Sequence, residues 1–398
     1  MCFVTDETRM TVPEVDSMKR LRQLVLLMLV AAAVNACTAA GASAGAFMVE
    51  DREEKIQSVT IAAVGDNLIH ESVYKKAYDR KTDTYDFDHM YDPVREKISS
   101  YDIAVINQET VFAADRRQIS SYPRFGTPCE MGDAIVNAGF DIVLGATNHI
   151  WDKGEYGVNT MLGYWRDHYP AITLLGIHES VEDYDAVDYV EVNGIRIALF
   201  NYTYGTNGII VPRAKYYTVN LLSQKEKFLS DVREAEENAD ITLCFLHMGD
   251  GYRHTPNAFQ VNYAKELIDA GADVLICSHP HAVQPYGVVT TDSGSSGLVY
   301  FSCGNFISGQ GTAQCVLGGL AEVTITKTEG PEGSFTEVTS FDFIPTVTHF
   351  DQMSESVYLL EDYTDELASE HSIREWDPSF GTDSLWKLWN ETMSIGIQ

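Results

Sequence analysis

The sequence predicts an α/β fold, because short, mainly apolar runs alternate with stretches of helical pattern. Runs of this length that are rich in Val and Ile are typical of buried strands, and they lie at residues 59–64, 103–106, 142–144, 195–200, 241–246, 274–277 and 298–301. In "NAFQVNYAKELIDAGADVLI" an amphipathic helix ends at Gly271 and leads into the next strand. Towards the end, "AEVTITKTEG" and "FTEVTSFDF" predict antiparallel strands added to this core.

The composition is that of a soluble globular protein. The chain has 398 residues, of which 45% are apolar and 22% are charged, enough for one large domain or two modest ones. Its formal net charge is −30 and its Lys and Arg form no basic stripe. This excludes nucleic acid as a partner, because phosphate backbones are held by clustered cations. A polyanionic ligand would need a cation between itself and this protein.

The N-terminus has the layout of a secretory signal peptide. A cluster of cations at residues 19–22 precedes an apolar run at residues 24–34, which is too short to span a membrane. Cys37 follows where a bacterial lipoprotein signal has its lipidated residue, so we expect a lipoprotein signal at residues 1–37. The alternative is an uncleaved signal anchor that extends through residues 36–46. We therefore expect a cell-membrane protein whose body faces outward, or a secreted one.

Four segments are predicted along the chain. They are a signal peptide at 1–37, a linker at 38–56, a single domain at 57–350 and a C-terminal extension at 351–398. Met18 starts a conventional signal peptide by itself, which makes it a candidate for the true start of translation. The extension mixes acidic and aromatic residues and has no candidate catalytic cluster, so we expect it to provide a packing or partner surface.

The seven cysteines do not have the pattern of a disulfide framework. Cys244 and Cys277 lie inside apolar strand-like runs, and with Cys37 set aside the others are scattered. We therefore expect buried free thiols.

Side chains that can bind metals follow five of the predicted strands, at their carboxyl ends. They are Asp66, Asn107, Glu109, Asn148, His149, His247, His279 and His281. Loops at the carboxyl ends of strands in α/β sheets converge on one crevice, where ligands bind. Each residue alone has a structural explanation, as part of a turn, a loop cap or a hydrogen-bonded core histidine. Five such strand ends in one chain favour a shared site.

The residue types of this set point to borderline divalent metals. Imidazole together with carboxylate oxygen suits zinc, manganese or iron, and nothing suggests thiolate ligation. The set is too large for one ion, so we predict two divalent ions that share a carboxylate and lie ~3.5–4 Å apart. Such a pair can clamp a phosphoryl group and activate water. His279 and His281, separated by Pro280, can each face a different ion.

Six segments resemble, in order, the motifs of the CapA family of bacterial capsule synthesis or poly-γ-glutamate biosynthesis proteins. They are "AVGDNLIH", "INQET", "ATNHIWDKGEYG", "LHMGDGYRHTPNAFQ", "CSHPHAVQP" and "FSCGNFI". The resemblance covers residues 57–350. The domain of that family belongs to the calcineurin-like metallophosphoesterase superfamily. It implies a four-layer α/β/β/α sandwich of two mixed sheets flanked by helices.

The resemblance also implies roles for the candidate residues. Asp66 and His281 would bind the first ion, Glu109 would bridge, and Asn148, His247 and His279 would bind the second. His149 would act as general acid beside the leaving group, and Asp152 would orient it. His70 and Asn107 are candidates for an extra ligand or a substrate contact, and His70 is equally explained as an ordinary residue in the first turn of a helix.

This chain departs from the family pattern at several positions. The superfamily's first motif, Asp-x-His, has Leu68 in place of the histidine. The motif that carries the usual bridging aspartate is Asn107-Gln108-Glu109, as in CapA relatives. Met248 and Gly251 stand where the family often has tryptophan and glutamate, and Cys277 replaces a glycine.

Three functions remain open from the sequence. The first is an exported, metal-dependent hydrolase of a phosphoester or a γ-linked glutamyl polymer in capsule formation. The second is a non-catalytic accessory protein that holds the polymer or a membrane-bound capsule synthase. The third is a plain binding lipoprotein with structural histidines. Bulk binding of poly-γ-glutamate by the general surface is not expected, because both are anionic.

Overall fold

The computed structural model describes residues 54–331 and 333–397. The predicted signal peptide, Cys37 and residues 38–53 of the predicted linker lie outside the described residues. Within the described part, no helix is both long and apolar enough to cross a membrane.

The first sheet is mixed. In spatial order it contains β18 (Glu355–Leu359), β17 (Gly333–Phe350), β16 (Leu317–Gly330), β1 (Lys55–Leu68), β4 (Ile103–Asn107), β7 (Ile142–Leu144) and β8 (Thr173–Leu175), with β15 (Asn305–Ser308) paired to β1 beside this path. The strands β15, β1, β4, β7 and β8 pair in parallel. The strands β16, β17 and β18 are added in antiparallel orientation.

The second sheet is also mixed. Its spatial order is β13 (Val283–Thr290), β14 (Ser296–Cys303), β12 (Val274–Ser278), β11 (Ile241–His247), β10 (Ile195–Thr203) and β9 (Asp188–Val192). The four inner strands are parallel and the two edge strands are antiparallel. Two small ribbons lie outside both sheets, β2 (Tyr78–Asp79) with β3 (Thr84–Tyr85), and β5 (Phe112–Ala113) with β6 (Thr127–Pro128).

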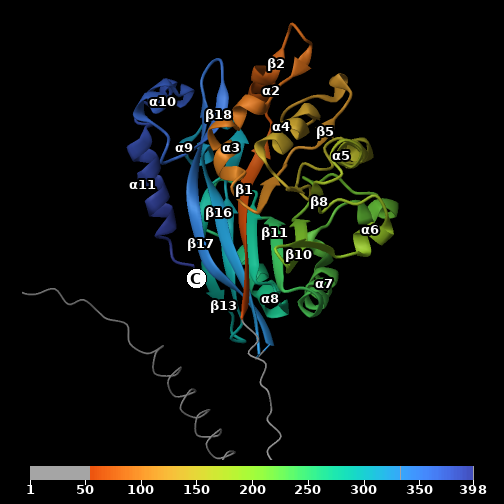
Figure 1. Cartoon of the computed structure of the whole chain (residues 1–398). Coiled ribbons are helices and arrows are strands. Elements are labelled where there is room, and N and C mark those ends of the chain that lie inside the picture. The colour runs from red at the N-terminus through yellow and green to blue at the C-terminus, as the bar shows by residue number, and fades with distance from the viewer. Residues whose placement is uncertain (1–53, 332, 398) are drawn as a thin grey trace, which may run out of the picture. The chain divides into compact units, whose positions relative to one another are not determined.

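The two sheets pack face to face, with helices on both outer sides (Figure 1). Alternate residues of β1 show why: Ile61 and Ala63 pack against the second sheet, whereas Ala62 and Val64 pack against helices. The helices on this side are α2 (Glu71–Ala77), α3 (Asp92–Ile98), α4 (Glu130–Ala138) and α5 (Gly154–His168). The second sheet is covered by α7 (Lys225–Asn238) and α8 (Ala258–Ala270). The predicted α/β class and four-layer order are confirmed.

The C-terminal segment packs onto this body. After β18 come α10 (Asp365–Glu370) and α11 (Thr382–Met393), next to α9 (Ala313–Val316) and β17 in Figure 1. Leu385 and Trp389 of α11 belong to the core between the two sheets. The Trp389 ring lies 4.9 Å from that of Phe343 in β17, so the extension covers apolar surface where the sheets meet.

All seven predicted buried strands are present, and the two late segments form the antiparallel pair β16 and β17. The helix predicted before Gly271 is α8, which ends there with Gly271 at φ +117°. Asp66 lies within β1 instead of after its end, because β1 continues past Gly65 by pairing with β15. The remaining helix, α6 (Val181–Asp185), is a single short turn before β9.

The cysteines among the described residues are free, as expected. Cys244, Cys277, Cys303 and Cys315 are buried, and Cys129 is half-buried.

Candidate metal centre

Asp66 lies at the meeting point of three parallel strands. In β1 it pairs with Asn107 of β4 on one side and with Asn305 of β15 on the other, so the three side chains start at one level. Gly65 is needed just before it, because a Cβ there would collide with the backbone carbonyl of Gly304. The Asp66 side chain is fully buried, and its Oδ1 accepts a hydrogen bond of 2.7 Å from Asn107 Nδ2.

Glu109 lies at the centre of the site, fully buried, just beyond β4. Its Oε1 lies 3.7 Å from His247 Nε2, and its Oε2 lies 3.7 Å from His281 Nδ1. Neither oxygen accepts a hydrogen bond from a residue that the structure describes. Its backbone is fixed, because the carbonyl accepts a bond of 2.7 Å from Thr147 Oγ1. A buried carboxylate without a donor needs a cation nearby.

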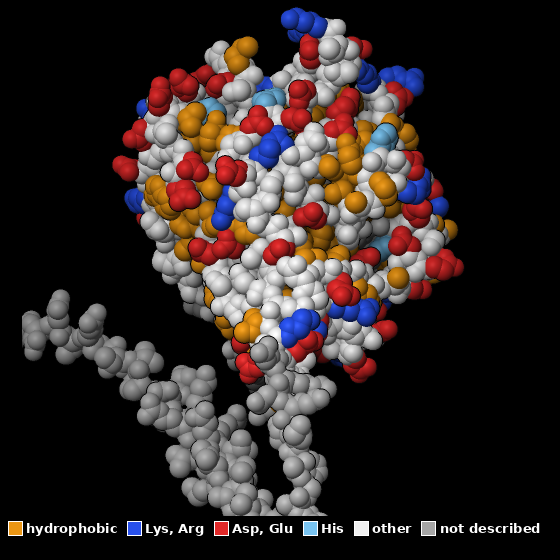
Figure 2. Space-filling model, viewed as in Figure 1, with side chains coloured by type: hydrophobic (Ala, Val, Ile, Leu, Met, Phe, Trp, Pro, Cys, Tyr) orange, Lys and Arg blue, Asp and Glu red, His pale blue; other side chains and the backbone are white. Residues whose placement is uncertain are grey.

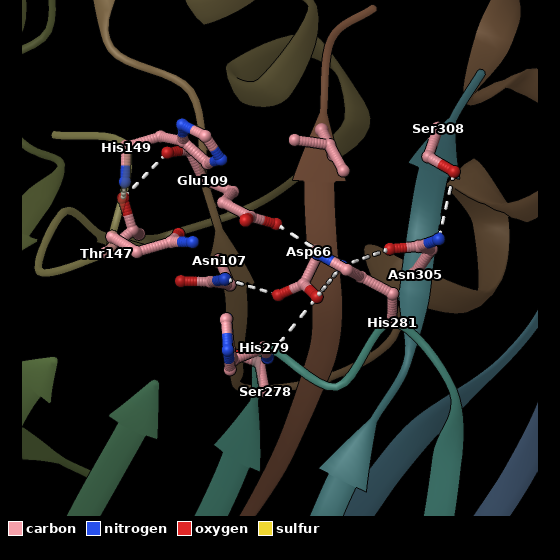
Figure 3. Close-up of polar contacts among 12 residues, drawn as sticks. Asp66, Asn107, Glu109, Thr147, His149, Ser278, His279, His281, Asn305 and Ser308 are labelled. Atoms are coloured by element: carbon pink, nitrogen blue, oxygen red, sulfur yellow. Dashed lines mark hydrogen bonds and ion pairs between the residues drawn. The ribbon is translucent and has the colours of Figure 1, made fainter. Parts of the chain in front are cut away.

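Two groups of potential ligands share this glutamate. One contains Glu109, His247 and His279. The other contains Asp66, Glu109 and His281, which are labelled in Figure 3. Within each group the ligand atoms lie within 4.8 Å of one another. The described residues therefore include places that could hold a divalent metal.

The conformation of the loop that carries His279 and His281 explains why these side chains belong to different ligand groups. His279 and His281 have positive φ angles of 98° and 57°, conformations that residues other than glycine adopt at a cost. The loop is fixed by the backbone N–H of His279, 3.3 Å from Asp66 Oδ2, and by Pro280, whose carbonyl accepts a bond of 2.7 Å from Tyr252 N. The strained turn directs the two imidazoles into different groups.

His247 ends β11 and is held from both ring nitrogens. Its Nε2 lies 2.9 Å from Asn148 Oδ1, and its Nδ1 lies 3.0 Å from Ser278 Oγ. The Asn148 amide oxygen thus lies beside the group that contains His247 and His279. This is the position that the family resemblance implies for an amide ligand of the second ion.

Burial and mutual charge shift the ionisation of the site. Burial, reinforced by the charge of Asp66, raises the pKa of Glu109 well above its usual range. Burial lowers the pKa of His279 to about 4 and that of His247 well below its usual range, helped by neighbouring histidines. Burial also opposes the charged form of His281, but Glu109 and Asp66 outweigh it and raise its pKa to about 9.

These shifts, the donor set and the unpartnered atoms fit a metal site. Neutral imidazoles are the form that binds metals, and the described residues offer no hydrogen-bond partner to His279 Nδ1 or Asn107 Oδ1. Without a metal, the carboxylates of Asp66 and Glu109 face His281 as the nearby cation. Residues present at the site therefore suit divalent cations.

His149 and Asp152 form a buried pair next to this centre. His149 Nδ1 lies 2.7 Å from Asp152 Oδ2, which also accepts a bond of 2.7 Å from the backbone N–H of Phe125. The imidazole packs edge-on against the Phe125 ring, with 4.7 Å between ring centroids. Asp152 is held by the Phe125 N–H, and His149 is held by Asp152 and by the Phe125 ring. This arrangement favours one tautomer and one orientation of the imidazole.

The two remaining candidates lie in different places. Asn107 bonds to Asp66 inside the centre and lies 3.3 Å from His247 Nδ1. His70 precedes α2 and lies outside both ligand groups, where the backbone N–H of Gly309 donates to its Nδ1 over 3.2 Å. Burial lowers the pKa of His70 to about 4, and its ring packs on Phe125. The structure places it at the edge of the His149 pair.

Three neighbours of the centre were not predicted. Asn305 Oδ1 lies 3.0 Å from His281 Nδ1, Ser278 Oγ contacts His247, and Asn207 Nδ2 lies 3.3 Å from His149 Nδ1. Asn305 had a usable signal, because "GNFI" follows a predicted strand as the other site residues do. Asn207 lies in a loop without such a signal.

The structure shows what surrounds the residues that depart from the family pattern. Leu68 is buried at the end of β1, so no imidazole enters the Asp66 group from this position. Met248 is also buried. A Cβ at Gly251 would meet open space, so this position offers no contact of its own to the site.

Solved structures resemble the chain only loosely. The calcineurin-like phosphoesterase YfkN from Bacillus subtilis is 10% identical, with a TM-score of 0.39, over 85% of this chain and 98% of that one. The NAD nucleotidase NadN from Haemophilus influenzae is 12% identical, with a TM-score of 0.41, over 85% of this chain and 67% of that one. These alignments carry no residue roles across.

Two curated relatives are similar in sequence. The capsule biosynthesis protein CapA of Bacillus anthracis is 25% identical over 296 residues, 72% of this chain and 68% of that protein. The PGA biosynthesis protein CapA of Bacillus subtilis (strain 168) is 26% identical over 216 residues, 54% of this chain and 55% of that protein. The chain thus spans about half of the second relative.

The family described as "Bacterial capsule synthesis protein PGA_cap" matches residues 60–310. This segment starts in β1, ends just after β15 and contains both ligand groups together with the His149 pair. The chain belongs to the PGA_cap family of bacterial capsule synthesis proteins.

Proposed function

We propose that the protein serves in capsule or poly-γ-glutamate biosynthesis as a metal-dependent hydrolase, with a phosphoester as its substrate class and a γ-glutamyl polymer as the alternative. Family membership supports the biosynthetic role. The observation that carries the hydrolytic role is Glu109, a buried carboxylate shared by two potential ligand groups without a hydrogen-bond donor among the described residues.

The residues at the centre suit two divalent ions of manganese, iron or zinc. Asp66 and His281 would hold one, with Glu109 shared. His247, His279 and the Asn148 amide would hold the other. Two such ions supply Lewis acidity towards a phosphoryl group and favour the ionised form of water.

His149 and Asp152 contribute proton transfer. Asp152 keeps Nδ1 of His149 engaged at 2.7 Å, so Nε2, which lies 3.4 Å from Asn207 Nδ2, is the nitrogen that would serve a leaving group. Asp152 therefore acts as a positioning residue. In this proposal Asp152 fixes the tautomer of His149 and the orientation of its imidazole, so that the proton is transferred at the ring nitrogen that faces away from Asp152.

A second function is favoured by Leu68 and Gly251, which stand where the family or its superfamily has a histidine and a glutamate. A protein with these replacements could keep a metal as a structural element. It would then hold the polymer or its synthase without turnover.

The test is elemental analysis of the purified protein, with hydrolysis of bis(p-nitrophenyl) phosphate and of poly-γ-glutamate assayed on the same samples. We expect nearly two metals per chain, lost together with hydrolysis in His279→Ala. His349→Ala is the matched control, because this buried histidine lies in another cluster. Metal without turnover of either substrate would favour the accessory role, and a metal-free protein would contradict both.

We further propose that Cys37 carries a lipid that holds the protein on the extracytoplasmic face of the membrane, close to a capsule synthase. The signal-like N-terminal sequence supports this. Cell fractionation of the wild type and Cys37→Ala tests it. The variant is expected to leave the membrane fraction, and equal membrane association would contradict the lipid anchor.

A further inference from the structure

A pocket of about 470 Å³ adjoins the His149 pair. Its walls include Tyr122 and Arg124 from one loop, Asn207 from another, and His149 and Asp152 between them. Asn207 joins this pocket to the metal centre, because its Oδ1 accepts a bond of 3.3 Å from Asn148 Nδ2. The pocket therefore opens beside the imidazole to which the proposed function assigns protonation of the leaving group.

The lining of this pocket contains an unpaired cation, whereas the molecule as a whole is strongly anionic. Asp152 is the one carboxylate among the lining residues; it is buried, and its Oδ2 contacts His149 and the backbone N–H of Phe125. Arg124 is exposed, and its guanidinium forms no ion pair with a residue that the structure describes. The protein has a net charge of −30, and its visible face in Figure 2 carries more Asp and Glu than Lys and Arg, so an unpaired cation beside His149 is distinctive.

The loop that carries Arg124 is fixed to the site. Ser120 and Gly126 exchange backbone hydrogen bonds of 3.1 and 3.0 Å, and Ser120 Oγ donates 2.6 Å to the carbonyl of Arg124. The next residue, Phe125, donates its N–H to Asp152 Oδ2. The same carboxylate thus orients His149 and holds the backbone beside Arg124, so the positions of the imidazole and of this backbone are coupled.

We propose that this pocket receives the leaving-group portion of the substrate and that Arg124 binds an anionic oxygen group on that portion. This rests on the proposed hydrolytic function and narrows it to phosphoesters whose leaving group carries its own negative charge. A planar guanidinium suits a carboxylate, which it can hold through two parallel hydrogen bonds. Arg124 is then a specificity-determining residue. It would neutralise the charge of the leaving group, so that the two metal ions of the proposed function would not have to do so.

Two substrates that differ by one charge test this. They are 4-carboxyphenyl phosphate and its methyl ester, 4-(methoxycarbonyl)phenyl phosphate. We expect the wild type to prefer the carboxylate, and the ratio of the two kcat/KM values to fall about tenfold in Arg124→Ala. Arg124→Lys should restore part of this preference. Arg117→Ala is the matched control, because Arg117 is also exposed but pairs with Asp115.

A binding measurement keeps the test independent of turnover. Titration calorimetry of 4-hydroxybenzoate, the charged leaving group itself, uses the wild type, Arg124→Ala and Arg117→Ala at low salt. We expect about tenfold weaker binding in Arg124→Ala alone and a loss of that difference at high salt. An unchanged kcat/KM ratio, or equal affinity in wild type and Arg124→Ala, would overturn the role of Arg124. Failure of hydrolysis with this binding difference intact would instead overturn the proposed catalysis.

Discussion

Two fully buried glutamates, one in the metal centre and one near the C-terminal extension, differ in what surrounds them. Glu355 in β18 pairs with Lys76 of α2, whose Nζ lies 3.2 Å from its Oε2. Glu109 has no Lys or Arg partner among the described residues, and neither of its oxygens accepts a hydrogen bond there. Both carboxyls have a raised pKa because of burial. The fold supplies a lysine to Glu355, whereas Glu109 faces the imidazoles of His247 and His281.

The nearby histidines repeat this contrast. In the C-terminal cluster, His371 Nε2 donates to the Thr348 carbonyl over 3.1 Å, and His349 Nδ1 contacts Tyr363 Oη at 2.8 Å. In the metal centre, His279 Nδ1 has no partner among the described residues. Burial and histidine content are therefore shared by both regions. The distinguishing feature among the described residues is that Glu109 lacks a partner at both oxygens and lies in two potential ligand groups, whereas Glu355 lacks one only at Oε1.

The largest expected effect comes from exchanging each glutamate for its neutral isostere. Glu109→Gln should lose at least one metal per chain and about 10³-fold in kcat, since metal-based stabilisation contributes several kcal/mol. Glu355→Gln should keep both metal and activity. Elemental analysis and phosphodiester assays on the two variants measure this. Equal metal content in both variants would remove the distinction between the two regions.

The second effect is on the pH dependence of stability. Burial raises the pKa of Glu355 from 4.5 to about 7, despite Lys76, so the folded state keeps its proton where the unfolded state has lost it. Its contribution to stability therefore falls as the pH rises from about 4.5 to about 7, by ~3 kcal/mol. Relative to wild type, Glu355→Gln should gain this amount over that window. Urea unfolding from pH 4.5 to 8 measures it, and parallel curves would contradict it.

The third effect is that of metal removal. A ligand present at 100 times its Kd stabilises the folded state by about 2.7 kcal/mol, so chelation should lower the unfolding free energy of the wild type by a similar amount. Glu355→Gln should respond in the same way, whereas Glu109→Gln should respond much less. Thermal unfolding with and without EDTA makes the comparison. An equal response of all three proteins would place the stabilising metal elsewhere.

The smallest effect concerns the C-terminal extension alone. Thr364 caps α10, since its hydroxyl accepts a bond of 3.2 Å from Leu367 N. Thr364→Ala should lower stability by about 1 kcal/mol and leave metal content and turnover unchanged. Thr364→Ser, which keeps the hydroxyl, is the control. A change in metal content would show that the two regions are coupled.

The sequence predicted the parts of the fold that are buried on both faces. β11 and β12 are mostly apolar, because one face meets the other sheet and the other meets a helix. The edge strands β9 and β18 were not predicted, because their partly exposed residues mix polar and apolar types. β8 is as short as the predicted β7, but it begins with Thr173 and is only partly buried.

The site residues that lie at the ends of apolar strands were predicted from the sequence. His247 and Asn107 each end an apolar strand, so their position on the chain already indicates a shared edge. Asn305 follows a predicted strand and was not singled out, and its place beside His281 is set by the pairing of β15 with β1, distant in sequence. Arg124 comes from a loop without periodicity, so its nearness to His149 follows only from the hydrogen bond between Phe125 and Asp152.

The position of α11 has a practical consequence for the length of the smallest stable fragment. The family match ends at residue 310, but Leu385 and Trp389 help to fill the interior between the sheets. A recombinant fragment that ended at residue 310 would also lack the antiparallel strands β16 to β18 and would expose one long side of β1. Such an unpaired edge promotes aggregation. A fragment that ends at residue 310 is therefore expected to aggregate, even though it retains every candidate ligand.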